Sequence, residues 1–128
     1  MFSRVQNSVF YNRSLFEFDT KVECRSNIIE INNRKYINVK VLENLEILKQ
    51  LDRYCQSNIK NYLQYCNNEN IIFVKLPFRY KRFDISFNNL LTSDLFNINE
   101  SFNCTIKFGG FVTINDNQTI CLKITKVF

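Results

Sequence analysis

The sequence predicts an α+β domain made mostly of antiparallel β-structure, with one main helix at about residues 41–66 between strands. Two observations lead to this class. In one segment in the middle of the chain, apolar residues recur at every third or fourth position, which is typical of a helix. On both sides of that segment they recur at every second position, which is typical of strands. Short Asn-containing stretches join the alternating segments, which favours local hairpins. A length of 128 residues and a hydrophobic content of 45% suit a single domain over residues 1–128.

Three strands are expected before the helix. The first covers residues 9–18, which are dense in Phe, Tyr and Val. The next two cover residues 28–31 and 36–41 and flank the stretch NNRK. Because Asn tolerates the left-handed backbone conformation, NN is a suitable hairpin turn. Alternation places three residues on one face: Ile37, Val39 and Val41.

The helix is predicted by a stripe of apolar residues at spacings of three and four. Its members are Val41, Leu45, Leu48, Leu51, Cys55, Ile59, Tyr62 and Cys66. Charged residues such as Glu43, Glu46 and Lys49 fall outside the stripe and suit a solvated face. We therefore read the stripe as the side of the helix that packs against the core.

Strands are expected again after residue 70. Residues 71–76 predict a strand that the basic stretch VKLPFRYKRF continues, and residues 88–101 predict a loop with one helical turn. A further strand is expected at residues 102–108, where apolar and polar residues alternate.

The C-terminal region predicts a hairpin. Residues 111–114 and 119–127 have strand character and flank NDN, a suitable turn, with Ile120, Leu122 and Ile124 facing inward and Lys123 outward. Gly109-Gly110 precedes this hairpin. The pair is read as a turn or bulge, or as a place where a ligand or another backbone approaches closely.

Strand alternation divides the basic stretch into two rows. One row is apolar and is expected to face the core: Val74, Leu76, Phe78 and Tyr80. The other row is cationic with an aromatic residue at each end: Phe73, Lys75, Pro77, Arg79, Lys81 and Phe83. Pro77 lacks an amide proton for a ladder hydrogen bond, so it indicates an edge or a bulge. Arg82 falls in the apolar row, which indicates that the strand ends or shifts register before it.

The net charge is +5, and the basic excess lies in the middle of the chain. Residues 53–82 carry six basic side chains against the acid Glu69, whereas residues 17–52 and 83–128 are each slightly acidic. A local basic surface indicates a polyanionic partner better than the total charge does. Heavy use of Asn, Ile, Phe and Lys tracks A/T-rich codons, as in some viruses, mobile elements and parasites.

Several functional classes lack their usual residues. The chain has no histidine, which removes Ser–His and Cys–His nucleophiles, and it has no glycine-rich phosphate-binding motif. Its five cysteines are odd in number, form no CxxC, and are read as buried reduced thiols. No apolar run could cross a membrane, and the N-terminal residues do not read as a secretory signal. We expect an intracellular protein, in the cytoplasm or nucleus of a host cell, that is not an enzyme and uses no cofactor or metal.

The order strands, helix, strands, with a basic aromatic strand after the helix, resembles the OB-fold. The closing GGFVTINDNQTICLKITKV also resembles the final strands of OB-type single-stranded DNA-binding proteins of large DNA viruses and mobile elements. The resemblance implies a small OB-like β-barrel with its helix between the third and fourth strands, and a function in coating or recognising single strands in DNA replication. The chain departs from that family because it ends KITKVF instead of in an acidic tail.

A cationic strand face with flanking aromatics suits single-stranded nucleic acid, because Lys and Arg neutralise phosphates and aromatic rings stack on unpaired bases. The candidate nucleic-acid-binding residues are Lys75, Arg79, Lys81, Arg82, Phe83, Lys107 and Phe111. DNA is favoured over RNA as the ligand. Two alternatives stay open. One is a solvated edge strand that its charges protect from aggregation. The other is a viral or mobile-element accessory subunit that binds a protein partner, or a second copy, through an exposed strand edge.

Overall fold

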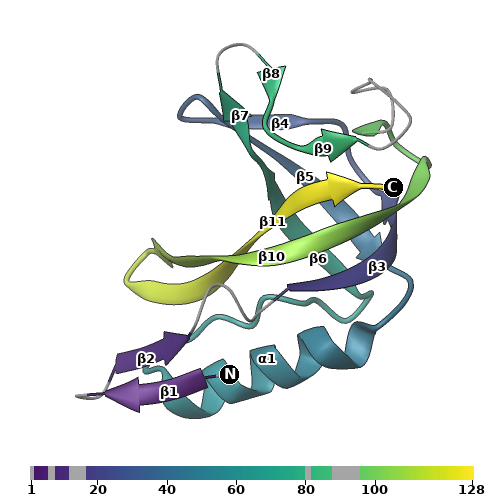
Figure 1. Cartoon of the computed structure of the whole chain (residues 1–128). Coiled ribbons are helices and arrows are strands. Elements are labelled where there is room, and N and C mark those ends of the chain that lie inside the picture. The colour runs from purple at the N-terminus through teal and green to yellow at the C-terminus, as the bar shows by residue number, and fades with distance from the viewer. Residues whose placement is uncertain (1, 6–7, 12–16, 80–81, 88–95) are drawn as a thin grey trace.

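The chain folds as mostly β-structure around one cluster of buried apolar side chains (Figure 1). The structure is a computed structural model, and it describes residues 2–5, 8–11, 17–79, 82–87 and 96–128. The helix of this described part is α1 (Leu45–Asn58). The strands are β1 (Phe2–Val5), β2 (Ser8–Tyr11), β3 (Glu17–Cys24), β4 (Ile29–Ile31), β5 (Arg34–Val41), β6 (Ile71–Leu76), β7 (Phe78–Arg79), β8 (Arg82–Phe83), β9 (Ser86–Phe87), β10 (Ser101–Ile114) and β11 (Asn117–Val127).

Five strands form a closed ring of hydrogen-bonded neighbours. β3 pairs with β5, β5 with β6, β6 with β11, β11 with β10, and β10 returns to β3. Every pair in the ring is antiparallel except β6–β11, which is parallel. In Figure 1, α1 lies across the lower end of this ring. The prediction of a mostly antiparallel sheet with one main helix is therefore confirmed for the described residues.

The inward faces of the ring strands are those that alternation predicts. Ile37, Val39 and Val41 of β5 are buried, and so are Ile120, Leu122 and Ile124 of β11. The neighbouring residues on each strand point the other way, which leaves Lys123 half-buried on the outer face. Burial of these side chains is the dominant favourable term, at about 25 cal/mol per Å² of apolar surface.

Two hairpins form at the turns that the sequence predicts. Asn32 and Asn33 join β4 to β5, and both have positive φ, 51° and 65°. Asn115 and Asp116 join β10 to β11 with φ of 48° and 67°. Two consecutive left-handed residues match the twist of the flanking strands, and Asn and Asp tolerate that conformation better than other residues with a side chain.

Gly109 and Gly110 form a bulge within one long strand. β10 continues through them to Ile114, and its register with β11 shifts between Phe108 and Gly110. Gly110 has φ of 116°, which residues with a Cβ rarely adopt. A Cβ on Gly109 would lie 3.2 Å from the carbonyl oxygen of Cys121. The structure therefore has both the predicted bulge and a close approach of another backbone, that of Cys121.

The helix is shorter than the apolar stripe predicts. Val41 belongs to β5, and Asn44, with φ of 56°, turns the chain into α1. At the other end, Ile59 is extended, so the helix ends at Asn58. Tyr62 and Cys66 have the apolar spacing of the stripe but lie after the helix, in a segment that folds back on α1 and is held there by hydrogen bonds to Asp52. Apolar spacing alone does not distinguish a helix from a loop that covers the same core.

The basic stretch does not continue β6, and this part of the prediction is wrong. β6 ends at Leu76, and after Pro77 the chain forms the short hairpin β7–β8. The amide of Asp84 donates to the carbonyl oxygen of Pro77 at 2.7 Å and closes the base of this hairpin. Proline cannot donate to the ladder, so the sheet loses a hydrogen bond where the prediction extended it.

Two further predictions differ at their bounds. The expected strand at residues 9–18 corresponds to β2 and the start of β3, and residues 12–16 between them lie outside the described residues. Residues 88–95 of the expected loop also lie outside, while the amide of Glu100 donates to the carbonyl oxygen of Asn97 in a turn. Within the described residues, no helix is both long and apolar enough to span a membrane.

Candidate nucleic-acid interface

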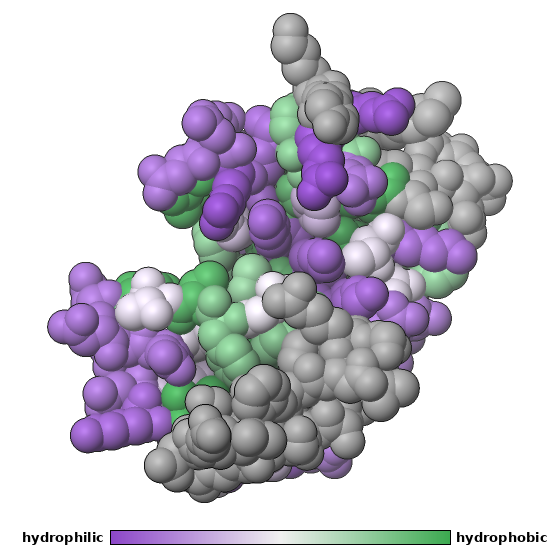
Figure 2. All heavy atoms as spheres, turned by 60° about the vertical axis from the view of Figure 1, so that its left-hand side comes forward, coloured by the Kyte–Doolittle hydropathy of each residue, from purple (hydrophilic) through white to green (hydrophobic). Residues whose placement is uncertain are grey.

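Lys75 and Arg79 line one pocket at the upper rim of the ring. The pocket has a volume of about 250 Å³ and is lined by Asn33, Arg34, Lys35, Lys75, Leu76, Pro77, Phe78, Arg79, Asp84 and Lys123. Five of these side chains are basic and one is acidic. We call it the basic pocket. Figure 2 brings the left-hand side of Figure 1 forward and shows hydrophilic side chains gathered over the upper part of this face.

Strand register explains why these cations meet. Lys75 of β6 lies directly opposite Lys123 of β11, and Lys123 lies opposite Lys107 of β10 on its other side. Cross-strand partners point to the same face of a sheet, so the three lysines form a row on the outside of the ring. Arg34 lies on this same outer face of β5, two residues before Tyr36, which is opposite Lys75. Lys35 lies opposite the buried Leu76, on the other face of β5, but it lines the same pocket at the start of the strand.

Few acids neutralise this cluster. Lys35 forms an ion pair with the exposed Glu30 at 3.1 Å, and Asp84 lies at the pocket wall. Burial raises the pKa of the Cys121 thiol, and the positive charges of Lys75, Lys123 and Arg34 partly oppose this rise. Like charges on neighbouring strands repel, which is tolerated where an anionic ligand compensates for it.

Alternation places Phe78 in the core-facing row and Phe83 in the solvent-facing row, and the structure shows Phe78 as the more exposed of the two. Phe78 is 37% exposed, and the Lys35 ammonium lies 4.7 Å from the centre of its ring. Phe83, predicted to stack on a base, is half-buried and packs edge-to-face against Phe78 and the buried Phe96. The prediction that Phe78 faces the core is therefore wrong, because the chain leaves β6 at Pro77 and β7 pairs with β8, which brings Phe83 against Phe78.

Among the described residues, the other predicted side chains do not line the basic pocket. Arg82 lies on β8 opposite Arg79, and Lys107 and Phe111 lie on β10. The Phe111 ring packs edge-to-face on Phe108 and is 36% exposed. Lys81 lies outside the described residues.

Sequence reasoning missed Arg34, Lys35 and Lys123 as members of this site. Arg34 and Lys35 follow the NN turn, and Lys123 was expected only to face out of the sheet. Segment charge concealed the first two, because residues 17–52 are slightly acidic in total. Their position could have indicated them, because Arg34 and Lys35 are basic residues just after a predicted hairpin turn, on the strand that pairs with β6.

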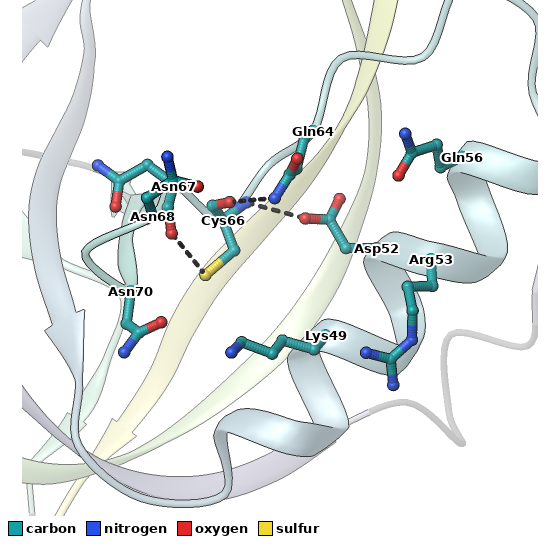
Figure 3. A pocket seen from close by; sticks show the side chains of 9 residues that line it. All are labelled: Lys49, Asp52, Arg53, Gln56, Gln64, Cys66, Asn67, Asn68 and Asn70. Carbon is teal, nitrogen blue, oxygen red and sulfur yellow. Dashed lines mark hydrogen bonds between the residues drawn. The ribbon is translucent and has the colours of Figure 1, made fainter.

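A second pocket, of about 220 Å³, lies between α1 and the segment 64–70 (Figure 3). Lys49, Asp52, Arg53 and Gln56 come from the helix, and the segment contributes Gln64, Cys66, Asn67, Asn68 and Asn70. The Gln64 amide donates to the carbonyl oxygen of Cys66 at 2.9 Å, and Arg53 pairs with Glu46 at 2.7 Å. Its polar groups therefore mostly serve the protein itself.

Asp52 is the buried carboxylate of this second pocket, at 4% exposure. It accepts hydrogen bonds from the amide of Cys66 at 3.0 Å, from the amide of Tyr65 at 2.9 and 3.1 Å, and from the Tyr62 hydroxyl. Burial and this last bond hold the pKa of Tyr62 well above its ordinary value. Both oxygens of Asp52 are engaged, so we read it as an anchor for residues 62–66 instead of a base.

The thiols are not arranged for chemistry in the described part of the chain. Burial raises the pKa of Cys24, Cys55 and Cys104 to about 12, which keeps them protonated and weakly nucleophilic. All five cysteines are free. Among the described residues, no three Cys, Asp or Glu side chains gather in a way that could hold a metal ion.

Comparison with known proteins places this chain in no group. No family model, no curated protein and no solved structure matches it.

Proposed function

We propose that this protein binds single-stranded nucleic acid, DNA in preference to RNA, through the basic pocket, and that it does so without catalysis. The observation that carries the proposal is the convergence of five basic side chains from three separate segments on one pocket of about 250 Å³. Such a cluster suits the repeated charges of a phosphate backbone. A single strand bends to follow a concave surface of this kind, and aromatic side chains beside the cations can stack on its bases.

Strand order supports an OB-like reading of the ring. In chain order, the ring strands are β3, β5, β6, β10 and β11, and the ring runs first, second, third, fifth, fourth. OB-folds are five-stranded Greek-key barrels that bind oligonucleotides on the face of their second and third strands, flanked by loops that include the one between the fourth and fifth. Here the second and third strands are β5 and β6, which carry Arg34, Lys35 and Lys75.

One feature departs from the implied family pattern. The helix α1 lies between the second and third ring strands, β5 and β6, and not between the third and fourth. The proposal does not depend on this placement, because α1 lies at the lower end of the ring, away from the basic pocket at the upper rim (Figure 1).

A salt series on an oligo-dT probe tests the proposal. If all five cations neutralise phosphates, log K falls with log salt at a slope of about −3.5, from about 0.7 per contact. The double variant Lys75→Gln, Lys123→Gln should lower the affinity and reduce the slope by about 1.4. The matched control is Lys49→Gln, Lys60→Gln, which removes the same charge outside the basic pocket. Absence of binding at low salt, or equal effects of the two double variants, would contradict the proposal.

Binding of a protein through a strand edge is the second candidate, and one observation favours it. β10 pairs with β3 only as far as Lys107, so within the described chain residues 108–114 pair with β11 alone. Phe111, Val112 and Ile114 on this segment are 36%, 37% and 49% exposed. Such an edge can accept an added strand. Light scattering over a range of concentrations tests pairing with a second copy: a dimer that Phe111→Lys dissociates supports it, and a constant monomer contradicts it.

A further inference from the structure

An apolar groove lies beside the basic pocket. Its volume is about 480 Å³, and it is bounded by the turn of β4–β5, the tip of β10–β11, and the segment 63–65. It is lined by Ile31, Asn32, Tyr36, Leu63, Gln64, Tyr65, Phe73, Val112, Thr113, Ile114, Thr119, Ile120 and Cys121. Figure 2 shows a notch between two hydrophilic projections on this face, with hydrophobic side chains on its floor. We call it the apolar groove.

The groove and the basic pocket are continuous along three strands. On β5, Tyr36 lines the groove and Arg34, two residues away, lines the pocket. The same step leads from Phe73 to Lys75 on β6, and from Cys121 to Lys123 on β11. Residues two apart on a strand share a face and lie about 7 Å from each other. One ligand can therefore contact both halves, with its anionic part on the cations and its apolar part in the groove.

The floor of the groove contains a ready aromatic platform. Tyr36 and Phe73 are stacked, with ring centres 4.8 Å apart and planes at 14°. Both side chains are half-buried, so their orientation is set before a ligand arrives. The aliphatic rim is more exposed: Ile31 is 47%, Leu63 39%, Val112 37% and Ile114 49% accessible.

Most polar groups at the groove are already occupied. The Gln64 amide donates to the carbonyl oxygen of Cys66 at 2.9 Å. The Thr119 hydroxyl donates to the carbonyl oxygen of Leu63 at 2.9 Å, and the Tyr65 hydroxyl to that of Phe73. A base in this groove would thus meet aromatic faces and aliphatic side chains more than hydrogen-bonding partners.

From this geometry we propose that the apolar groove holds unpaired bases of a DNA strand whose phosphates occupy the basic pocket, and that it favours thymine. The proposal rests on the proposed function and adds the base subsite and its preference. Charge complementarity selects the occupant, because the groove opens directly onto the cations. Thymine is the base with an exposed methyl group, and an aliphatic rim gains by covering it. A preference for DNA over RNA follows, since uracil lacks this methyl.

Three probes of equal length and charge separate the contributions: oligo-dT, oligo-dU and an abasic oligodeoxynucleotide. Stacked bases should make oligo-dU bind at least about tenfold more tightly than the abasic strand. Each covered methyl should make oligo-dT tighter than oligo-dU by about fourfold, which is the equivalent of about 0.8 kcal/mol. Fluorescence anisotropy at one low salt concentration measures all three affinities.

A pair of variants assigns the effect to the groove. Leu63→Ser with Ile114→Ser should bring the ratio of oligo-dT to oligo-dU affinity to about one and leave the abasic affinity unchanged. The matched control is Leu42→Ser with Ile98→Ser, at exposed positions outside the groove, and it should keep the wild-type ratio. All four positions are at least 39% exposed, so the variants should fold, and circular dichroism checks this.

The outcomes distinguish the two proposals. If no probe binds, the proposed function fails. If all three bind equally, the phosphate pocket stands and the base subsite is overturned. If oligo-dT and oligo-dU bind equally but more tightly than the abasic strand, the thymine preference is overturned. If the groove variants leave the probe ratios unchanged, the groove is not the base subsite, and an apolar protein segment becomes its better occupant.

Discussion

Asp52 illustrates how one side chain organises a segment that lacks regular structure. It holds residues 62–66 against α1, and this segment supplies Leu63, Gln64 and Tyr65 to the apolar groove. We expect Asp52→Ala to lower the free energy of unfolding by about 2–4 kcal/mol, because two buried amides would lose a charged acceptor. Urea denaturation measures this. Glu46→Ala is the control on the same helix, where an exposed ion pair is lost with little effect. Equal effects of the two changes would contradict the anchoring role.

The buried thiols predict how stability depends on pH. Cys24, Cys55 and Cys104 have a pKa near 12 in the folded protein, above the value of 9.0 for an exposed thiol. Their folded-state pKa is raised, so their contribution is intact below pH 9 and is lost as the pH rises from about 9 to 12, where the unfolded chain ionises first.

We therefore expect the urea midpoint to fall steeply above pH 9. In the variant Cys24→Val, Cys104→Val, this fall should be shallower, because two of the three groups no longer titrate. A variant that keeps the full pH dependence would contradict the assignment to these thiols.

At the scale of elements, β10 continues through its bulge past its pairing with β3, and Val112 and Ile114 near its end line the apolar groove. Gly110→Ala should destabilise the fold by about 1–3 kcal/mol, because φ of 116° suits only glycine. Thermal unfolding measures this. Gly109→Ala is the comparison: its backbone is not strained, and its Cβ needs a shift of only tenths of an ångström from the Cys121 carbonyl. A larger effect at Gly109 than at Gly110 would contradict the backbone argument.

The hairpin turns and the end of β6 differ in how well the sequence predicts them. Both Asn-containing hairpin turns could be predicted, since the left-handed tendency of Asn is local chemistry. The course of the chain after Leu76 could not, although Pro77 indicated an irregularity there. Whether a proline ends a strand or interrupts it depends on whether a neighbouring strand continues alongside, and β7 pairs with β8 instead.

At the scale of the whole molecule, ring closure concentrates positive charge. Lys123 lies between Lys75 and Lys107, with like charges directly opposite on both sides. We expect Lys123→Gln to raise the free energy of unfolding by about 0.2–1 kcal/mol at low salt, and by less at high salt as screening increases. The same change should weaken binding of oligo-dT, which is the trade expected where a site is built from repelling charges.

Lys40 is the matched control, because it lies opposite Glu23 across the β3–β5 pair. Lys40→Gln removes an attraction, so it should lower stability slightly, with the opposite dependence on salt. Chemical denaturation at two salt concentrations distinguishes the two variants. If both change stability in the same direction, strand register does not determine the electrostatics of this face.

The sequence by itself determined the alternating core faces of the ring strands, the two Asn-containing hairpins and the class of fold, because these depend on residues close together in the chain. It also indicated Lys75 and Arg79 as part of a basic surface. Only the tertiary structure decided that Arg34, Lys35 and Lys123 join them, and that Phe83 packs inward while Tyr36 and Phe73 face the groove. The physical reason is that ring closure pairs strands far apart in sequence, and such pairings depend on burial summed over the whole core, which no local pattern encodes.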